Sequence, residues 1–79
     1  MMIGSSVTIG TMHGRIELYP GDMFQAIDRK MQSCKFQFLD YRASEDNRRF
    51  YLHDETHDKF MDVSGVWFNN RTINLIGGN

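Results

Sequence analysis

A run of alternating residues rich in aromatics, followed by a turn-forming segment and a second aromatic-containing run, constrains this chain more than any other feature. The runs are KFQFLDY at 35–41 and RRFYLH at 48–53, and ASEDN lies between them at 43–47. A period of two that is rich in aromatic residues is typical of a β-strand, and Ser, Asp and Asn favour turns. We therefore predict a hairpin, whose short connection makes the two strands antiparallel.

Further strands are predicted on both sides of this hairpin. SVTIGTMHGRIEL at 6–18 alternates on both sides of a turn, at which Gly14 can supply the positive φ that a tight hairpin needs. Residues 59–63 form another β-like run. Near the end of the chain, 66–68 and 71–76 are expected to pair through Asn69-Asn70, because asparagine tolerates the left-handed conformations of a two-residue turn.

One helix is predicted over residues 22–33. Asp22 follows Pro20-Gly21 and suits an N-cap, because its carboxylate can accept from free N–H groups of the first turn. Gln25 completes a capping-box pattern. The apolar residues of the segment recur at helical spacing, at Phe24, Ile27 and Met31.

Together these elements predict an α+β fold in which residues 1–79 form a single domain. We expect a small antiparallel β-sheet of about five to six strands with one helix packed on one face, in the order β-β-α-β-β-β-β. Within 35–41, Phe36 and Phe38 should face one side of the sheet, and Leu39 and Tyr41 the other. One short helix cannot cover both faces. The sheet should therefore either curl toward a barrel or leave an apolar patch for a partner.

The composition argues against several classes of function. Nine basic and ten acidic residues give a net charge of −1, which argues against a non-specific grip on duplex nucleic acid. The N-terminus lacks a signal-peptide pattern, and no run approaches the ~20 apolar residues of a membrane span. The single cysteine, Cys34, fits a reducing compartment and a structural thiol. We expect a cytoplasmic protein without a membrane partner. A homodimer stays open, because so small a core is marginal.

Of all the segments, HDETHD at 53–58 most closely resembles a metal-binding or catalytic site. His53 and His57 would share a face only on a helix, and the surrounding pattern predicts strands, so we interpret the segment as a polar turn. His53, His57 and Asp58 are weak candidates for metal ligands. No set of nucleophile, base and acid is apparent. We therefore predict no catalytic residue, no enzyme activity and no cofactor.

Aromatic and basic residues alternate along the predicted strands and suggest a binding surface. The candidate partner-binding residues are Tyr41, Arg48, Arg49, Tyr51 and Trp67. The predicted function is non-catalytic binding to another protein or protein complex, as an inhibitor, adaptor or accessory subunit. Small viral inhibitors encoded by phages share this profile by analogy. The alternative is single-stranded nucleic-acid binding by the same aromatic and basic face. A weaker alternative is metal binding through 53–58.

Overall fold

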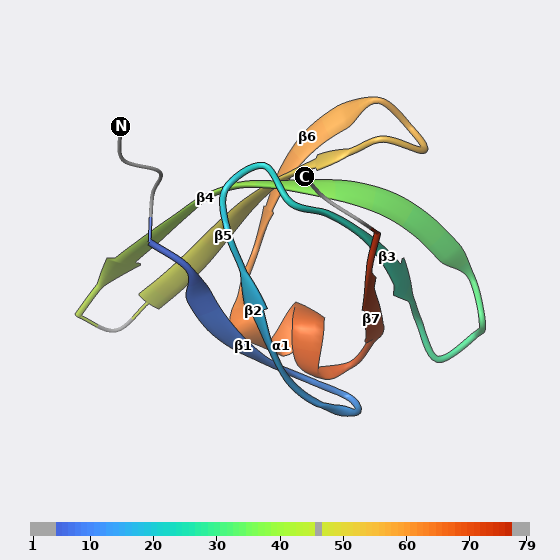
Figure 1. The fold of residues 1–79 in the computed structure, drawn as a ribbon, viewed down its shortest axis with the longest axis horizontal. Coiled ribbons are helices and arrows are strands. Elements are labelled where there is room, and N and C mark those ends of the chain that lie inside the picture. The colour runs from blue at the N-terminus through green and yellow to red at the C-terminus, as the bar shows by residue number, and fades with distance from the viewer. Residues whose placement is uncertain (1–4, 46, 77–79) are drawn as a thin grey trace.

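The computed structural model describes residues 5–45 and 47–76, which form seven strands and one short helix (Figure 1). In chain order the elements are β1 (Val7–Thr11), β2 (Gly14–Leu18), β3 (Met23–Ile27), β4 (Ser33–Ser44), β5 (Asn47–Asp54), β6 (Lys59–Val63), α1 (Gly65–Asn69) and β7 (Thr72–Leu75).

Five strands form one antiparallel sheet in the order β6-β5-β4-β3-β7, and β1 and β2 form a separate hairpin. The sheet arches over α1, and the hairpin crosses the same concave side (Figure 1). Strands β6 and β7 lie at opposite ends of the sheet order and do not pair with each other. The predicted antiparallel sheet is therefore confirmed, and it does not close into a barrel.

The two hairpins that the sequence predicts most strongly are both present. Strands β4 and β5 pair from Phe36↔Asp54 to Ser44↔Asn47. Strands β1 and β2 pair across a turn in which Gly14 has a φ of 122°. The Thr11 hydroxyl closes that turn by donating to the Gly14 carbonyl oxygen at 2.7 Å.

The predicted helix over 22–33 is wrong, because this segment contains β3, a turn and the first residue of β4. Asp22 does not cap a helix; its Oδ2 accepts from the Tyr19 N–H at 2.9 Å in the turn between β2 and β3. Gly21 has a φ of 98° in that turn. At the other end, Asp28 Oδ1 accepts from the Lys30 and Gln32 N–H groups. Asp22 and Asp28 therefore use their carboxylates to make turns on both sides of a strand.

The predicted hairpin over 66–76 is half right. Residues 72–75 are a strand, but 65–69 form α1, whose Phe68 is fully buried. Asn70 ends this helix: its backbone N–H and its side-chain Nδ2 both donate to the Val66 carbonyl oxygen. The element order is therefore β-β-β-β-β-β-α-β rather than the predicted one.

The core lies between the concave side of the sheet, α1 and the β1–β2 hairpin. Phe68 joins these layers, since its ring centroid lies 5.2 Å from that of Phe50 and 6.0 Å from that of Phe24. Ile9 and Leu18 bring the hairpin into the same cluster, at 2% and 0% exposed. The other buried apolar residues are Ala26, Phe36, Phe38, Leu52, Val63 and Ile73.

A β-bulge in β4 changes the predicted facing of its side chains. The register with β5 shifts between Phe38 and Asp40, so that Leu39 is the extra residue. Beyond the bulge, Tyr41 pairs with Phe50 and its ring lies 5.0 Å from the buried Phe50 ring. Tyr41 therefore lies on the core side with Phe36 and Phe38, and its predicted placement on the opposite face is wrong.

Within residues 5–45 and 47–76, no helix is long and apolar enough to cross a membrane.

Two phenylalanines test how far stability depends on α1. Phe68→Ala is expected to lower the free energy of unfolding by about 3–5 kcal/mol, because it leaves a cavity beneath the helix. Phe60→Ala is the matched control and should change it by about 0.5 kcal/mol or less, because Phe60 is 76% exposed. Urea unfolding followed by circular dichroism measures both. Equal losses for the two variants would contradict this account of the core.

Candidate functional site

The convex side of the five-stranded sheet, which we name the outer face, is not covered by any described element. The residue pairs Arg42↔Arg49, Asp40↔Tyr51, Tyr51↔Asp62 and His53↔Phe60 lie on this face of β4, β5 and β6. Paired residues of antiparallel strands share a face, and their neighbours along the chain point to the other side. The helix α1 and the β1–β2 hairpin both pack on the concave side (Figure 1). The outer face therefore meets solvent.

Phe60 is the most unusual residue of the outer face, because its large apolar ring is 76% exposed within a regular strand. Beside it lies a shallow hollow of about 240 Å³. The half-buried residues Leu39 and Tyr51 contribute to its lining. The full lining set is Leu39, Tyr51, Leu52, Phe60, Met61 and Asp62. We name this hollow with Phe60 the Phe60 patch.

Charged side chains at the edge of the Phe60 patch are paired with one another. Arg49 Nε lies 3.2 Å from Asp62 Oδ2, and Arg42 Nε lies 3.3 Å from Asp40 Oδ2. The Arg42 guanidinium also lies 5.9 Å from the centroid of the Tyr51 ring. An apolar centre with a polar rim is the usual anatomy of a protein-binding surface.

His53 borders the same patch and is held by two carboxylates. Its Nδ1 lies 2.6 Å from Glu55 Oε2, its Nε2 lies 3.0 Å from Asp58 Oδ1, and its ring lies 4.6 Å from the Phe60 ring. The hydrogen bond to Glu55 is the main cause that raises the pKa of His53 above 6.5; burial opposes it, and Asp58 adds to it. Both carboxylates only accept, so the doubly protonated ring satisfies both contacts.

The segment 53–58 is the end of β5 followed by a turn, as its interpretation as a polar connection predicts. Asp54 is 4% exposed. Its Oδ1 accepts from the Thr56 and His57 N–H groups, and its Oδ2 accepts from His57 Nδ1 at 2.8 Å. Burial alone would raise the pKa of Asp54, but the bonds from His57 and Thr56 together hold it below its usual value.

The weak metal candidates do not form a ligand set. His53 is on the outer face and both of its ring nitrogens are bound to carboxylates, whereas His57 is bound to Asp54. Across residues 5–45 and 47–76, no three His, Cys, Asp or Glu side chains are grouped closely enough to hold a metal ion.

The five predicted partner-binding residues are not on one surface. Arg49 and Tyr51 lie on the outer face. Tyr41 and Arg48 lie on the concave side, where Arg48 Nε donates to the Tyr41 hydroxyl at 3.0 Å and its guanidinium lies 5.4 Å from the Phe50 ring. Trp67 packs edge-on against the Phe36 ring at 5.2 Å, also on the concave side.

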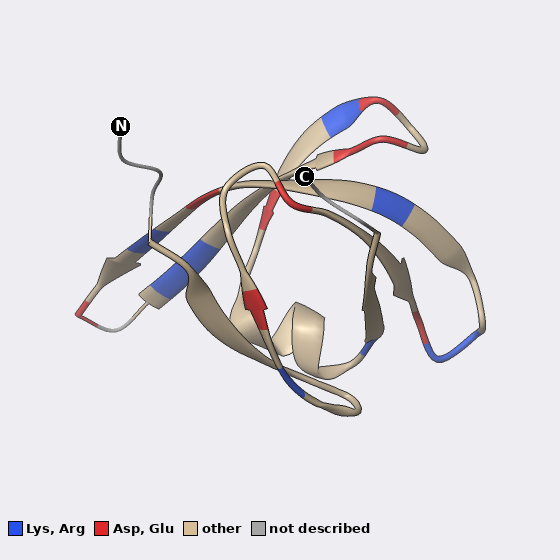
Figure 2. Ribbon diagram, viewed as in Figure 1, with Lys and Arg blue, Asp and Glu red and all other residues tan. Residues whose placement is uncertain are grey.

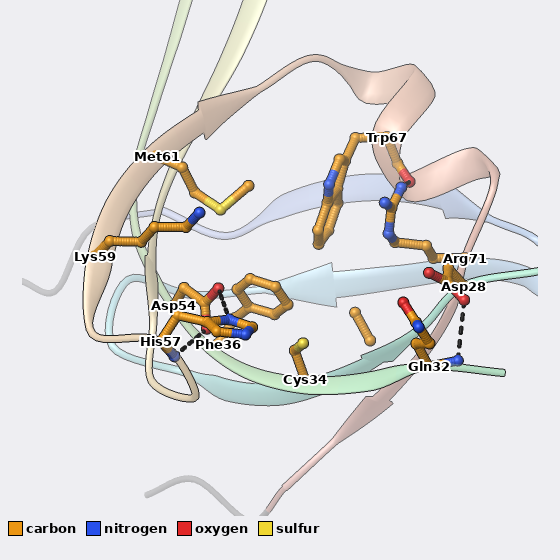
Figure 3. A pocket seen from close by; sticks show the side chains of 11 residues that line it. Asp28, Gln32, Cys34, Phe36, Asp54, His57, Lys59, Met61, Trp67 and Arg71 are labelled. Atoms are coloured by element: carbon orange, nitrogen blue, oxygen red, sulfur yellow. Dashed lines mark hydrogen bonds and ion pairs between the residues drawn. The ribbon is translucent and has the colours of Figure 1, made fainter. Parts of the chain in front are cut away.

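Trp67 and Cys34 line a second hollow, which lies between α1 and the β5–β6 turn (Figure 3). This Trp67 pocket has a volume of about 190 Å³. No hydrogen bond between described residues joins the Cys34 thiol to His57, so a nucleophile–base pair is not assembled. The full lining set is Ala26, Asp28, Gln32, Cys34, Phe36, Asp54, His57, Lys59, Met61, Trp67 and Arg71.

Sequence reasoning did not select Phe60, Lys59 or Arg71. In KFMDV at 59–63, both faces of the strand carry an apolar residue, so alternation alone does not show that Phe60 points outward and Met61 inward. Lys59 and Arg71 enter one pocket only through the packing of β6 and α1 (Figure 3).

No protein-family model matches this chain, and neither the curated proteins nor the solved structures contain a match to it.

The His53 cluster predicts a stability that depends on pH. Because folding raises the pKa of His53, its contribution is fully present below the unfolded pKa of about 6.5 and is lost as the pH rises through the folded pKa. This contribution to the free energy of unfolding is measured by urea unfolding of the wild type and of His53→Gln at pH values from about 5 to about 9. The difference between the two proteins should shrink with rising pH, and a constant difference would refute the assignment.

Asp54 is expected to be the most costly carboxylate to replace. Asp54→Asn removes a buried charge that accepts three hydrogen bonds and should lower the free energy of unfolding by about 1–3 kcal/mol at neutral pH. The control is Asp40→Asn, whose exposed ion pair should contribute about 0–1 kcal/mol. Because folding lowers the pKa of Asp54, this contribution should disappear as the pH falls through the folded value. An Asp54→Asn protein as stable as the control would contradict this role of the Asp54 carboxylate.

Proposed function

We propose that this protein is a non-catalytic binding module that docks another protein on the Phe60 patch, and that it acts as an inhibitor, adaptor or accessory subunit of a larger complex. The exposure of Phe60 is the observation that carries the proposal. A phenylalanine that is 76% exposed adds little to the stability of its own domain. Burial of that ring by a partner would add apolar contact at the centre of an interface.

The surroundings of Phe60 support a protein partner. Leu39 and Tyr51 extend the apolar area, and the hollow beside Phe60 can receive a side chain from a partner. Arg49 and Asp62 supply both signs of charge at the rim, where they can form polar contacts and fix orientation. A mixed rim around an apolar centre matches a protein surface better than it matches a polyanion.

Single-stranded nucleic acid is the alternative ligand for the same face, and the charges disfavour it. Tyr51 and Phe60 could stack with bases, but the guanidinium groups of Arg42 and Arg49 are paired with Asp40 and Asp62. Figure 2 shows basic and acidic residues interspersed along β4, β5 and β6. A phosphate backbone needs a continuous positive surface, which this arrangement does not provide.

Capture from a lysate of the native host, with and without nuclease, distinguishes the two ligands. A protein partner held mainly by apolar contacts should remain bound after nuclease treatment and in high salt. A nucleic-acid complex should weaken steeply with salt. Retention of nucleic acid alone, with no protein, would overturn the proposal in favour of the alternative.

Variants of the Phe60 patch test the surface itself. Phe60→Ala and Tyr51→Ala should each weaken the captured complex about 30-fold, which is about 2 kcal/mol for a central interface residue. Met31→Ala is the matched control, because Met31 is also apolar and is 80% exposed but lies outside the patch. Calorimetric titration of the purified partner measures each affinity. If Phe60→Ala binds like the control, the Phe60 patch is not the docking surface.

A further inference from the structure

The Trp67 pocket carries positively charged groups that lack a negative partner. Among the described residues, no carboxylate lies within ion-pair distance of Lys59 or Arg71, whereas Arg42 and Arg49 are each paired with one. Arg71 instead donates from Nη1 to the Trp67 carbonyl oxygen at 3.0 Å and lies over the indole ring, 4.3 Å from its centroid.

The two ends of the pocket differ in charge. Figure 3 shows Lys59 and Met61 on one side of the Trp67 indole and Arg71 on the other, near Asp28. Asp28 balances the Arg71 end, although its Oδ1 already accepts two backbone N–H groups. Of the two carboxylates among the described residues that line the pocket, Asp54 is the one at the Lys59 end, and it is 4% exposed and bonded through both oxygens. The Lys59 end therefore presents positive charge to a ligand.

His57 adds a second polar group at the Lys59 end. Its Nδ1 donates to the ionised Asp54, so the ring is fixed in orientation by a buried group. Its Nε2 has no hydrogen-bond partner within residues 5–45 and 47–76.

The rest of the pocket is apolar and aromatic. Phe36 and Cys34 lie at its base, and Met61 and the Trp67 indole form its walls (Figure 3). At about 190 Å³ the pocket is smaller than the ~300–1,000 Å³ of sites for drug-sized ligands. It therefore suits a group of about the size of one side chain, with an apolar body and one anionic end.

We propose that the Trp67 pocket binds a carboxylate joined to an aromatic ring by a short alkyl chain, with the ring against Trp67 and Met61 and the carboxylate at Lys59. Such a group occurs in a small aromatic acid and also at the end of a peptide whose last residue is aromatic. Both sources present the same chemistry to the pocket. The site lies on the concave side of the sheet and does not depend on the protein-binding function proposed for the outer face.

Trp67 supplies the readout, because it is the only tryptophan in the chain. Its fluorescence is followed during titration with 3-phenylpropionate and with a tetrapeptide that ends in phenylalanine with a free carboxylate. The matched amides of both compounds are titrated in parallel. The proposal predicts a saturable change for at least one acid and a much weaker response to its amide. Binding of the free acid, or only of the peptide, identifies the source.

Two lysine variants locate the carboxylate. Lys59→Gln should weaken binding of the acid about tenfold, as expected for a lost charge-assisted hydrogen bond. Lys35→Gln is the control, because Lys35 pairs with Gln25 on the outer face and does not line the pocket. No saturable response to either acid, equal binding of acid and amide, or equal affinities in the two variants would overturn the proposal.

Discussion

The contact of Phe68 with Phe24 and Phe50 is the interaction on which the rest of the structure depends. It attaches α1 to two strands of the sheet, and Ile9 and Leu18 of the β1–β2 hairpin belong to the same buried cluster. A domain of this size has few apolar side chains to bury, so one concentrated aromatic cluster has to supply much of its cohesion. Because α1 and the hairpin both use the concave side, the outer face is left without cover.

The sequence predicts much of the sheet because alternation and turn chemistry agree there. Over 35–53, strand periodicity and a turn cluster indicate the same hairpin, and the structure contains it. The prediction is wrong over 22–33, where the apolar residues fit both periods. Phe24 and Ala26 fit a strand, whereas Phe24, Ile27 and Met31 fit a helix. The segment forms a strand because β3 pairs with both β4 and β7. Such long-range contacts leave no pattern in the local sequence.

The candidate surfaces could be predicted only in part. Arg49 and Tyr51, two of the five predicted partner-binding residues, lie on the outer face. The bulge at Leu39 turns Tyr41 toward the core, and a single extra residue of this kind reverses every later side chain of a strand. The Trp67 pocket combines residues from β3, β4, β5, the β5–β6 turn, β6 and α1. No spacing in the sequence encodes that combination.

A second copy of this chain would compete with the proposed partner for the Phe60 patch, and such a dimer has a specific geometric requirement. A two-fold dimer uses the same surface on both copies, so the surface must complement itself. Arg49 and Asp62 place both signs of charge beside Phe60, and a rotated copy could therefore pair Arg49 with Asp62 of its partner. That exchange would require breaking the Arg49–Asp62 ion pair within each copy. Forming the same ion pair across the interface instead would give little net gain in binding free energy. The dimer would then depend on apolar burial of Phe60 and Tyr51 alone. The hollow beside Phe60 would then receive a side chain of the other copy, whereas a different protein is not restricted to the side chains of this surface.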